Sequence, residues 1–213
     1  NWQFSPQVED ADFTKIAQSA GLSSEVACLL YQRGIRDESS LKKFLEPSLE
    51  DLHDPYLLHD MDKAVERIRQ AIEQGELILV YGDYDADGMT SASIIKESLE
   101  QLGAECLVYL PNRFTDGYGP NASVYKYFIE QQGVSLIVTV DNGVAGHEAI
   151  DLAQSMGVDV IVTDHHSLPE VLPDAHAIVH PEHPESDYPF KYLAGCGVAF
   201  KLACALLEEV QVE

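Results

Sequence analysis

Short apolar runs alternate with stretches of helical periodicity through most of this chain. In the helical stretches, apolar side chains recur every three to four residues, as at Ala64, Ile68 and Ala71. The strand-like runs are nearly continuous in apolar residues and cover 77–82, 105–110, 136–140, 158–163 and 177–179. Strands that are buried on both faces and alternate with helices predict an α/β fold: a mostly parallel, doubly wound sheet with helices on both faces.

Local end signals delimit the expected helices. Gly75, Gly103 and Gly157 each follow an amphipathic stretch, and Asn121 can cap the start of another. The helices are expected at about 61–74, 89–102, 121–128, 149–156 and 198–210.

The first 55 residues have a less regular pattern. Ser23 can cap a helix that ends near Gly34, and Ser39 opens a second short helix that ends near Pro47. We therefore expect a small helical N-terminal segment, residues 1–55, packed on a main domain of residues 56–213.

Composition and charge narrow the range of possible functions. The 213 residues are 46% hydrophobic, and no apolar run is long enough to cross a bilayer, so no membrane contact is expected. The first residues lack a leader pattern, and the four cysteines form no C-x-x-C pair, which favours free thiols in the cytoplasm. The net charge of -23 argues against a nucleic-acid surface within these residues. Bound divalent metal would offset part of that charge.

The segment from Gly82 to Gly88 holds three carboxylates at alternate positions after the first strand, those of Asp83, Asp85 and Asp87. On an extended backbone they project to one side, where they repel one another unless a cation lies among them. Oxygen ligands of this kind suit Mg²⁺ or Mn²⁺. An EF-hand calcium loop is excluded, because its twelfth position, counted from Asp83, is the non-chelating Ile94.

Two further strands also end in acidic residues. Asp141 begins an Asp-Asn-Gly segment, and Asp164 is followed at once by His165 and His166. In open α/β sheets ligands bind beyond the carboxyl ends of the strands, so these groups are expected to meet at one edge. Asp141 alone is more often part of a plain turn, but between two metals its carboxylate could bridge them. Of the adjacent histidines, one can bind metal while the other faces substrate.

These three segments resemble the DHH phosphoesterase family. The similarity extends to Pro111-Asn112-Arg113 and Gly117-Tyr118-Gly119-Pro120. The segments 44–47, 60–68 and 195–202 resemble one branch of that family, bacterial exonucleases that degrade single-stranded DNA from the 5′ end during recombination and repair.

The resemblance implies two-metal hydrolysis of phosphodiester bonds with Mn²⁺ or Mg²⁺. It implies that the two ions are held by Asp83, Asp85, Asp87, Asp141 and His165. It assigns the catalytic roles to His166, Arg113 and Asp164, with His166 contacting the scissile phosphate or assisting proton transfer. The substrate is expected to contact Asn112, Arg113, Gly117, Tyr118, Gly119, Asn142, Gly195 and Gly197. For Gly195 and Gly197, close packing of a helix on the sheet explains the glycines equally well.

The resemblance also implies parts that these residues do not contain: a further metal-binding Asp, a second catalytic lobe and an oligonucleotide-binding domain. Single-stranded DNA is the expected partner, with single-strand-binding protein and a helicase as further candidates. One alternative is a phosphoesterase for short oligonucleotides, cyclic dinucleotides or pyrophosphate. Another is a structural relative without catalysis, which the intact ligand positions disfavour. Of the other histidines, only His180 is retained as a weak site candidate, and His147, His176 and His183 are expected to be structural or exposed.

Overall fold

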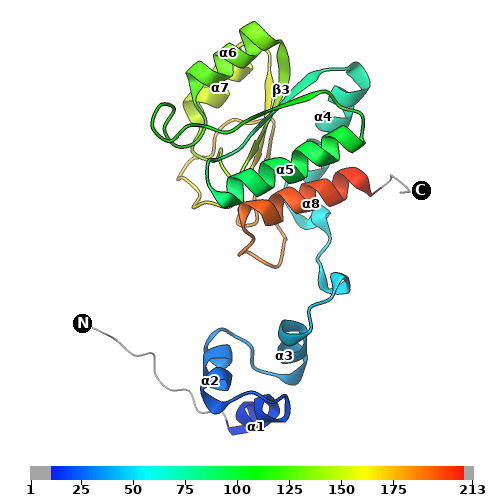
Figure 1. The fold of residues 1–213 in the computed structure, drawn as a ribbon, viewed down its shortest axis with the longest axis vertical. Helices are drawn as coiled ribbons and strands as arrows, with labels where there is room; N and C mark the ends of the chain where they lie inside the picture. Colours follow the sequence, from blue (N-terminus) through cyan, green and yellow to red (C-terminus); the bar gives the residue numbers. More distant parts are fainter. Residues whose placement is uncertain (1–10, 209–213) are drawn as a thin grey trace. The chain divides into compact units, whose positions relative to one another are not determined.

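The computed structural model describes residues 11–208. They fall into two compact units, divided between Leu52 and His53. Figure 1 shows the fold along the chain. The first unit is helical and contains α1 (Ala11–Ser19), α2 (Ser24–Gln32), α3 (Glu38–Leu45) and the 3-10 turn η1 (Leu49–Asp51). Its small core consists of Phe13, Ala17, Ala27, Leu30 and Leu41.

Capping residues fix the helix starts in this unit. Ser23 caps α2 by accepting a hydrogen bond from the backbone N–H of Val26, which confirms the expected cap. The next helix, α3, begins earlier than expected because Asp37, not Ser39, is its N-cap and forms a capping box with Ser40. The sequence pattern did not resolve α1 as a separate helix.

The second unit is built on a parallel sheet that has five strands in the described part of the chain, in the order β2-β1-β3-β4-β5. This confirms the predicted doubly wound α/β class. The strands are β1 (Leu77–Tyr81), β2 (Cys106–Tyr109), β3 (Val134–Val140), β4 (Asp159–Thr163) and β5 (Ala177–Val179). The helical elements are η2 (Pro55–Leu57), α4 (Met61–Gln74), α5 (Ala86–Gln101), α6 (Ala122–Gln132), α7 (His147–Ser155) and α8 (Gly195–Leu207).

Each face of the sheet is covered by helices, as expected. Ile78, Val138 and Ile161 belong to the core shared with α4, α5 and α8. The alternate residues Leu79 and Ile137 belong to the core shared with α6 and α7. The opposite orientation of neighbouring strand residues thus explains why the strands are apolar throughout. Figure 1 shows α5 and α8 side by side on one face.

The starts of α5 and α8 differ from the sequence prediction, and both lie at the acidic edge. The predicted start of α5 was Met89, but the helix begins at Ala86, so the backbone after Asp85 is helical and not extended. The predicted start of α8 was Val198, but Gly195 and Cys196 already form its first turn. The predicted end of α8, Val210, lies outside the described residues.

All four cysteines are free thiols: Cys28, Cys106, Cys196 and Cys204. Within residues 11–208, no helix has both the length and the apolar composition of a membrane span.

Candidate metal centre at the carboxyl edge of the sheet

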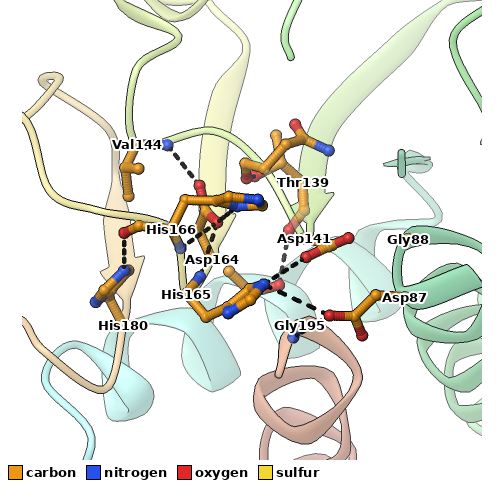
Figure 2. A network of polar contacts seen from close by, with 12 residues as sticks. Asp87, Gly88, Thr139, Asp141, Val144, Asp164, His165, His166, His180 and Gly195 are labelled. Carbon is orange, nitrogen blue, oxygen red and sulfur yellow. Dashed lines mark hydrogen bonds and ion pairs between the residues drawn. The ribbon is translucent and has the colours of Figure 1, made fainter. Parts of the chain in front are cut away.

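The acidic residues that follow β1, β3 and β4 converge, as the parallel topology predicts. Asp83, Asp85 and Asp141 offer carboxylate oxygens that all lie within 4.8 Å of one another, and Asp141, His165 and His166 form a second such group. Asp141 belongs to both groups. Figure 2 shows Asp87, Asp141 and His165 pointing toward one another, with Gly195 of α8 beside them.

Asp83 and Asp85 have different environments. Asp83 is buried, which raises the pKa of its carboxyl group, and the negative charge of Asp85 adds to that effect. Asp85 is exposed and is the N-cap of α5, where its Oδ1 accepts from the backbone N–H of Gly88 at 2.9 Å. One oxygen of Asp85 therefore fixes the helix start, and the other is left for a cation.

Asp87 lies in the first turn of α5 and is held by the first turn of α8. Its Oδ2 accepts from the N–H of Gly195 at 2.8 Å, and its Oδ1 accepts from the N–H of Cys196 at 2.7 Å. Burial acts to raise the pKa of Asp87, but these backbone hydrogen bonds outweigh it and lower the pKa. The helix N-terminus thus stabilises a carboxylate of the protein itself.

Asp141 is the most constrained acid of the centre. It adopts a left-handed backbone conformation, with φ of 61°, and is 1% exposed. Its Oδ1 lies 3.0 Å from Nε2 of His165 but accepts no hydrogen bond. Burial, followed by the charges of Asp87 and Asp85, raises its pKa to about 7.

The donor set fits a divalent cation. A buried oxygen without a hydrogen-bond donor, among converging carboxylates and an imidazole, gains a partner when a cation binds. Carboxylate oxygens with one histidine nitrogen are the ligands that Mn²⁺ and Mg²⁺ accept. In this arrangement Asp141 would be shared between two ions.

A buried polar network supports the backbone at Asp141. The hydroxyl of Thr139 donates to the carbonyl of Asn142 at 2.7 Å, and that of Thr163 donates to the carbonyl of Thr139 at 2.8 Å. The amide of Asn142 donates to the carbonyl of Val140 at 2.9 Å. Asn142 is 1% exposed, so the structure gives it a supporting position, and its predicted contact with substrate stays a prediction.

The turn after β4 is organised around Asp164. Its Oδ1 accepts from the backbone N–H groups of His165 and His166 and lies 2.7 Å from Nδ1 of His166, while its Oδ2 accepts from the N–H of Val144. The bond to Asp164 raises the pKa of His166. Burial acts to raise the pKa of Asp164, but the hydrogen bonds from His166 and Val144 lower it overall. Asp164 therefore orients His166, and both of its oxygens already accept hydrogen bonds within the turn.

The loop between β2 and α6 carries the other predicted contacts. Arg113 is exposed, and its guanidinium lies 4.8 Å from the centre of the Tyr84 ring, so it is near the edge without touching the carboxylates. Tyr118 is exposed, and its ring makes an edge contact with His166. Asn112 and Gly117 are exposed on the same loop.

A cavity of about 320 Å³ opens beside His166. It is lined by Tyr118, Gly119, Pro120, Gly143, Val144, Ala145, Asp164, His166 and Ser167. Gly119 accepts a hydrogen bond from the hydroxyl of Tyr81, which ties the loop to the sheet. The predicted residues Tyr118, Gly119 and His166 thus share one hollow.

The two glycines of α8 provide a matched test of the centre. A Cβ at Gly195 would collide with Oδ1 of Asp141, whereas a Cβ at Gly197 would meet only the side chain of Leu193, at 3.2 Å or more. Gly195→Ala is therefore expected to displace Asp141 and reduce Mn²⁺ affinity at least about 10-fold, whereas Gly197→Ala should stay within about twofold. Isothermal titration with Mn²⁺ measures both. Equal affinities in the two variants would contradict this packing role.

Among the described residues, the other histidines considered in the sequence lie away from the carboxylates of the metal centre. Nε2 of His147 is 2.9 Å from the carbonyl of Val171, and the buried ring of His183 stacks on that of His59. His180 differs, because its Nε2 lies 2.8 Å from the carbonyl oxygen of His166. The only signal of this contact in the sequence is the position of a histidine directly after a strand.

Comparison with known proteins agrees with the geometry. A family model described as "DHH family, N-terminal domain" matches residues 77–213. The chain is 46% identical over 208 residues to the single-stranded-DNA-specific exonuclease RecJ of Bacillus subtilis, covering 97% of this chain and 26% of that protein. The corresponding values for Escherichia coli RecJ are 40% over 198 residues, 90% and 33%.

Solved structures give the same result. The structure of Thermus thermophilus RecJ in complex with Mn²⁺ aligns with a TM-score of 0.70 at 31% identity, over 94% of this chain and 28% of that one. A structure of exonuclease RecJ bound to manganese aligns with a TM-score of 0.66 at 34% identity, over 73% of this chain and 39% of that one. This chain therefore spans only about a third or less of the curated relatives it matches.

Proposed function

The chain belongs to the DHH family, and from this membership we propose that it forms the metal-binding part of an exonuclease that hydrolyses single-stranded DNA with two divalent cations. The observation that supports this most directly is the convergence of Asp83, Asp87, Asp141 and His165 at one edge of the sheet. The similarity to RecJ, named as specific for single-stranded DNA, supports the choice of substrate.

Asp83, Asp85 and Asp141 form one group of ligand atoms and would hold one ion. Asp141 and His165 of the second group would hold the other ion together with Asp87, whose Oδ2 lies 3.5 Å from Nε2 of His165. When bound, Mn²⁺ or Mg²⁺ would polarise the phosphate and make a water molecule more acidic.

The remaining residues position substrate and protons. The bond between Nδ1 of His166 and Asp164 leaves Nε2 of His166 available, and the raised pKa of His166 favours the protonated ring. A protonated Nε2 can donate to a phosphate oxygen or to the leaving oxygen. Arg113 on its exposed loop can pair with a phosphate through its planar guanidinium.

We extend the proposal to the biological setting. Attack from the 5′ end, a role in recombination and repair, and contact with single-strand-binding protein and a helicase follow from the family resemblance. The free thiols are consistent with a cytoplasmic location. With a net charge of -23, this chain would rely on other basic surfaces to hold a long strand.

The test is digestion of a long, 5′-labelled single strand by the intact gene product in Mn²⁺. Immediate release of labelled mononucleotide is expected, and chelation of the metal should stop it. His165→Ala should slow release more than about 100-fold. Substitution of residues that only hydrogen-bond to metal ligands already lowers metal affinity or activity about 10–100-fold.

A 3′-labelled strand serves as the polarity control, since its label should appear only at the end of digestion. Hydrolysis of dinucleotides without attack on the long strand would instead indicate a phosphoesterase for small substrates. Absence of both activities, together with failure to bind Mn²⁺, would indicate a structural relative.

A further inference from the structure

His180 follows β5 and is completely buried beneath the turn that carries His166. Its Nδ1 lies 3.0 Å from the backbone nitrogen of Glu182, and its Nε2 lies 2.8 Å from the carbonyl oxygen of His166. A backbone N–H can only donate, so Nδ1 is the acceptor. The proton of the neutral ring is therefore on Nε2, which donates to the His166 carbonyl.

Together with the bonds to Asp164, this bond holds the backbone at His166 from two sides. On one side, Asp164 accepts from the backbone N–H and from Nδ1 of His166. On the other side, His180 donates to the carbonyl of His166. Figure 2 shows Asp164 and His180 contacting His166 from different directions.

The His180 contact adds to what the sheet already fixes. Pairing between β4 and β5 covers Ile161 to Thr163, and one more backbone bond joins the N–H of Asp164 to the carbonyl of Val179. The ladder ends there, two residues before His166. The His180 bond is therefore directed at the turn, not at the sheet.

We propose that His180 is a positioning residue that holds His166 in the orientation needed to act on the phosphate. This inference rests on the proposed function. It assigns to His180 an effect on turnover through His166, with no contact between His180 and substrate or metal.

Three substitutions separate the two ring nitrogens. In His180→Gln, the amide nitrogen is as many bonds from Cβ as Nε2, so donation to the His166 carbonyl is kept. In His180→Asn, the side-chain oxygen replaces Nδ1 and keeps only the bond from Glu182. His180→Leu removes both.

Turnover and KM are measured in Mn²⁺ with single-stranded DNA and with bis(p-nitrophenyl) phosphate, in the intact gene product. Leu and Asn variants are expected to lower kcat about 10–100-fold with KM within about twofold, and the Gln variant should stay within about threefold of the parent. A parent-like kcat in the Leu variant, or a Gln variant as impaired as Leu, would overturn the proposal.

A double-mutant cycle with His166→Ala separates positioning from general destabilisation. If His180 acts through His166, adding His180→Leu to His166→Ala should change kcat by less than about twofold. A further loss as large as in the parent background would refute the inference. Cleavage of the small phosphodiester without attack on DNA would refute the DNA assignment alone, because the His180 series can still be measured on the small substrate.

Discussion

Asp141→Asn is expected to abolish hydrolysis and, in the same protein, to increase the stability of the metal-free state at pH 8. In the described part of the chain, one group of possible metal ligands contains Asp83 and another contains His165. Asp141 is the carboxylate that belongs to both. A neutral amide is a poor ligand for two cations at once. The loss of turnover should therefore exceed about 1,000-fold at any practical Mn²⁺ concentration.

The gain in stability follows from the pKa of Asp141. Its value rises from 3.8 in the unfolded chain to about 7 in the fold, chiefly by burial. Between these values the folded state holds more protons than the unfolded state, so the free energy of unfolding of the parent falls as pH rises. Asn does not titrate and avoids this cost, which is on the order of 4 kcal/mol above pH 7. Asn also tolerates the left-handed backbone.

Urea unfolding in chelator at pH 4 and pH 8 measures this effect. The advantage of Asp141→Asn should be small at pH 4 and reach its full value above pH 7. Asp151→Asn, at an exposed position on α7, is the control and should change stability by less than about 0.5 kcal/mol at either pH. If Asp141→Asn were less stable than the parent at pH 8, burial of the charged Asp141 carboxylate would not be what destabilises the parent.

The strands and their acidic ends could be predicted because both depend on local features. Each of β1, β3 and β4 is an apolar run that an acid follows, and a parallel sheet brings such ends together whatever the connections contain. Asp83, Asp141 and Asp164 needed no further information to be placed at one edge.

Other features of the centre depend on contacts between residues far apart in the sequence. Asp87 accepts a hydrogen bond from the N–H of Gly195, which is 108 positions away in the sequence. Local sequence patterns therefore predict neither the early start of α8 nor its contact with Asp87. The alternating carboxylates predict an extended backbone through Asp85, but Asp85 caps α5 by accepting from the N–H of Gly88, and the helix begins at the next residue. Gly88 itself packs against the backbone of Asp83, a contact that no periodicity encodes.

The role of Asp164 was also beyond sequence reasoning. The motif places it beside two histidines, which is equally compatible with a ligand and with a support. Only the four hydrogen bonds that it accepts show that its oxygens are occupied by the turn. Neighbouring residues of one motif thus differ in role: Asp164 orients the turn, and His165 is the proposed metal ligand.

Arg67→Met is expected to cause the largest loss of stability without changing the chemistry. Arg67 projects from α4, and its Nε lies 2.6 Å from Asp159 at the start of β4. Its Nη2 lies 2.7 Å from Oε2 of Glu76, just before β1. The guanidinium therefore joins the amino ends of two strands, at the edge of the sheet opposite the carboxylates of the metal centre.

Removing one partner of a buried ion pair leaves the other charge without compensation, which costs more than the pair itself contributes. Glu76 is 16% exposed and Asp159 is 42% exposed, so water relieves part of this cost. We expect a loss of about 3 kcal/mol, or roughly 6–12 °C in melting temperature, with kcat unchanged well below that temperature.

Lys96→Ala is the matched control, because Lys96 pairs with Glu100 on the exposed surface of α5. Exposed pairs contribute little, so this variant should lose less than about 1 kcal/mol. Equal losses in the two variants would mean that burial does not set the strength of the Arg67 contacts. A selective fall in kcat for Arg67→Met would mean that the amino edge of the sheet is coupled to the metal centre, since strands that shift at one end carry Asp83 and Asp164 with them at the other.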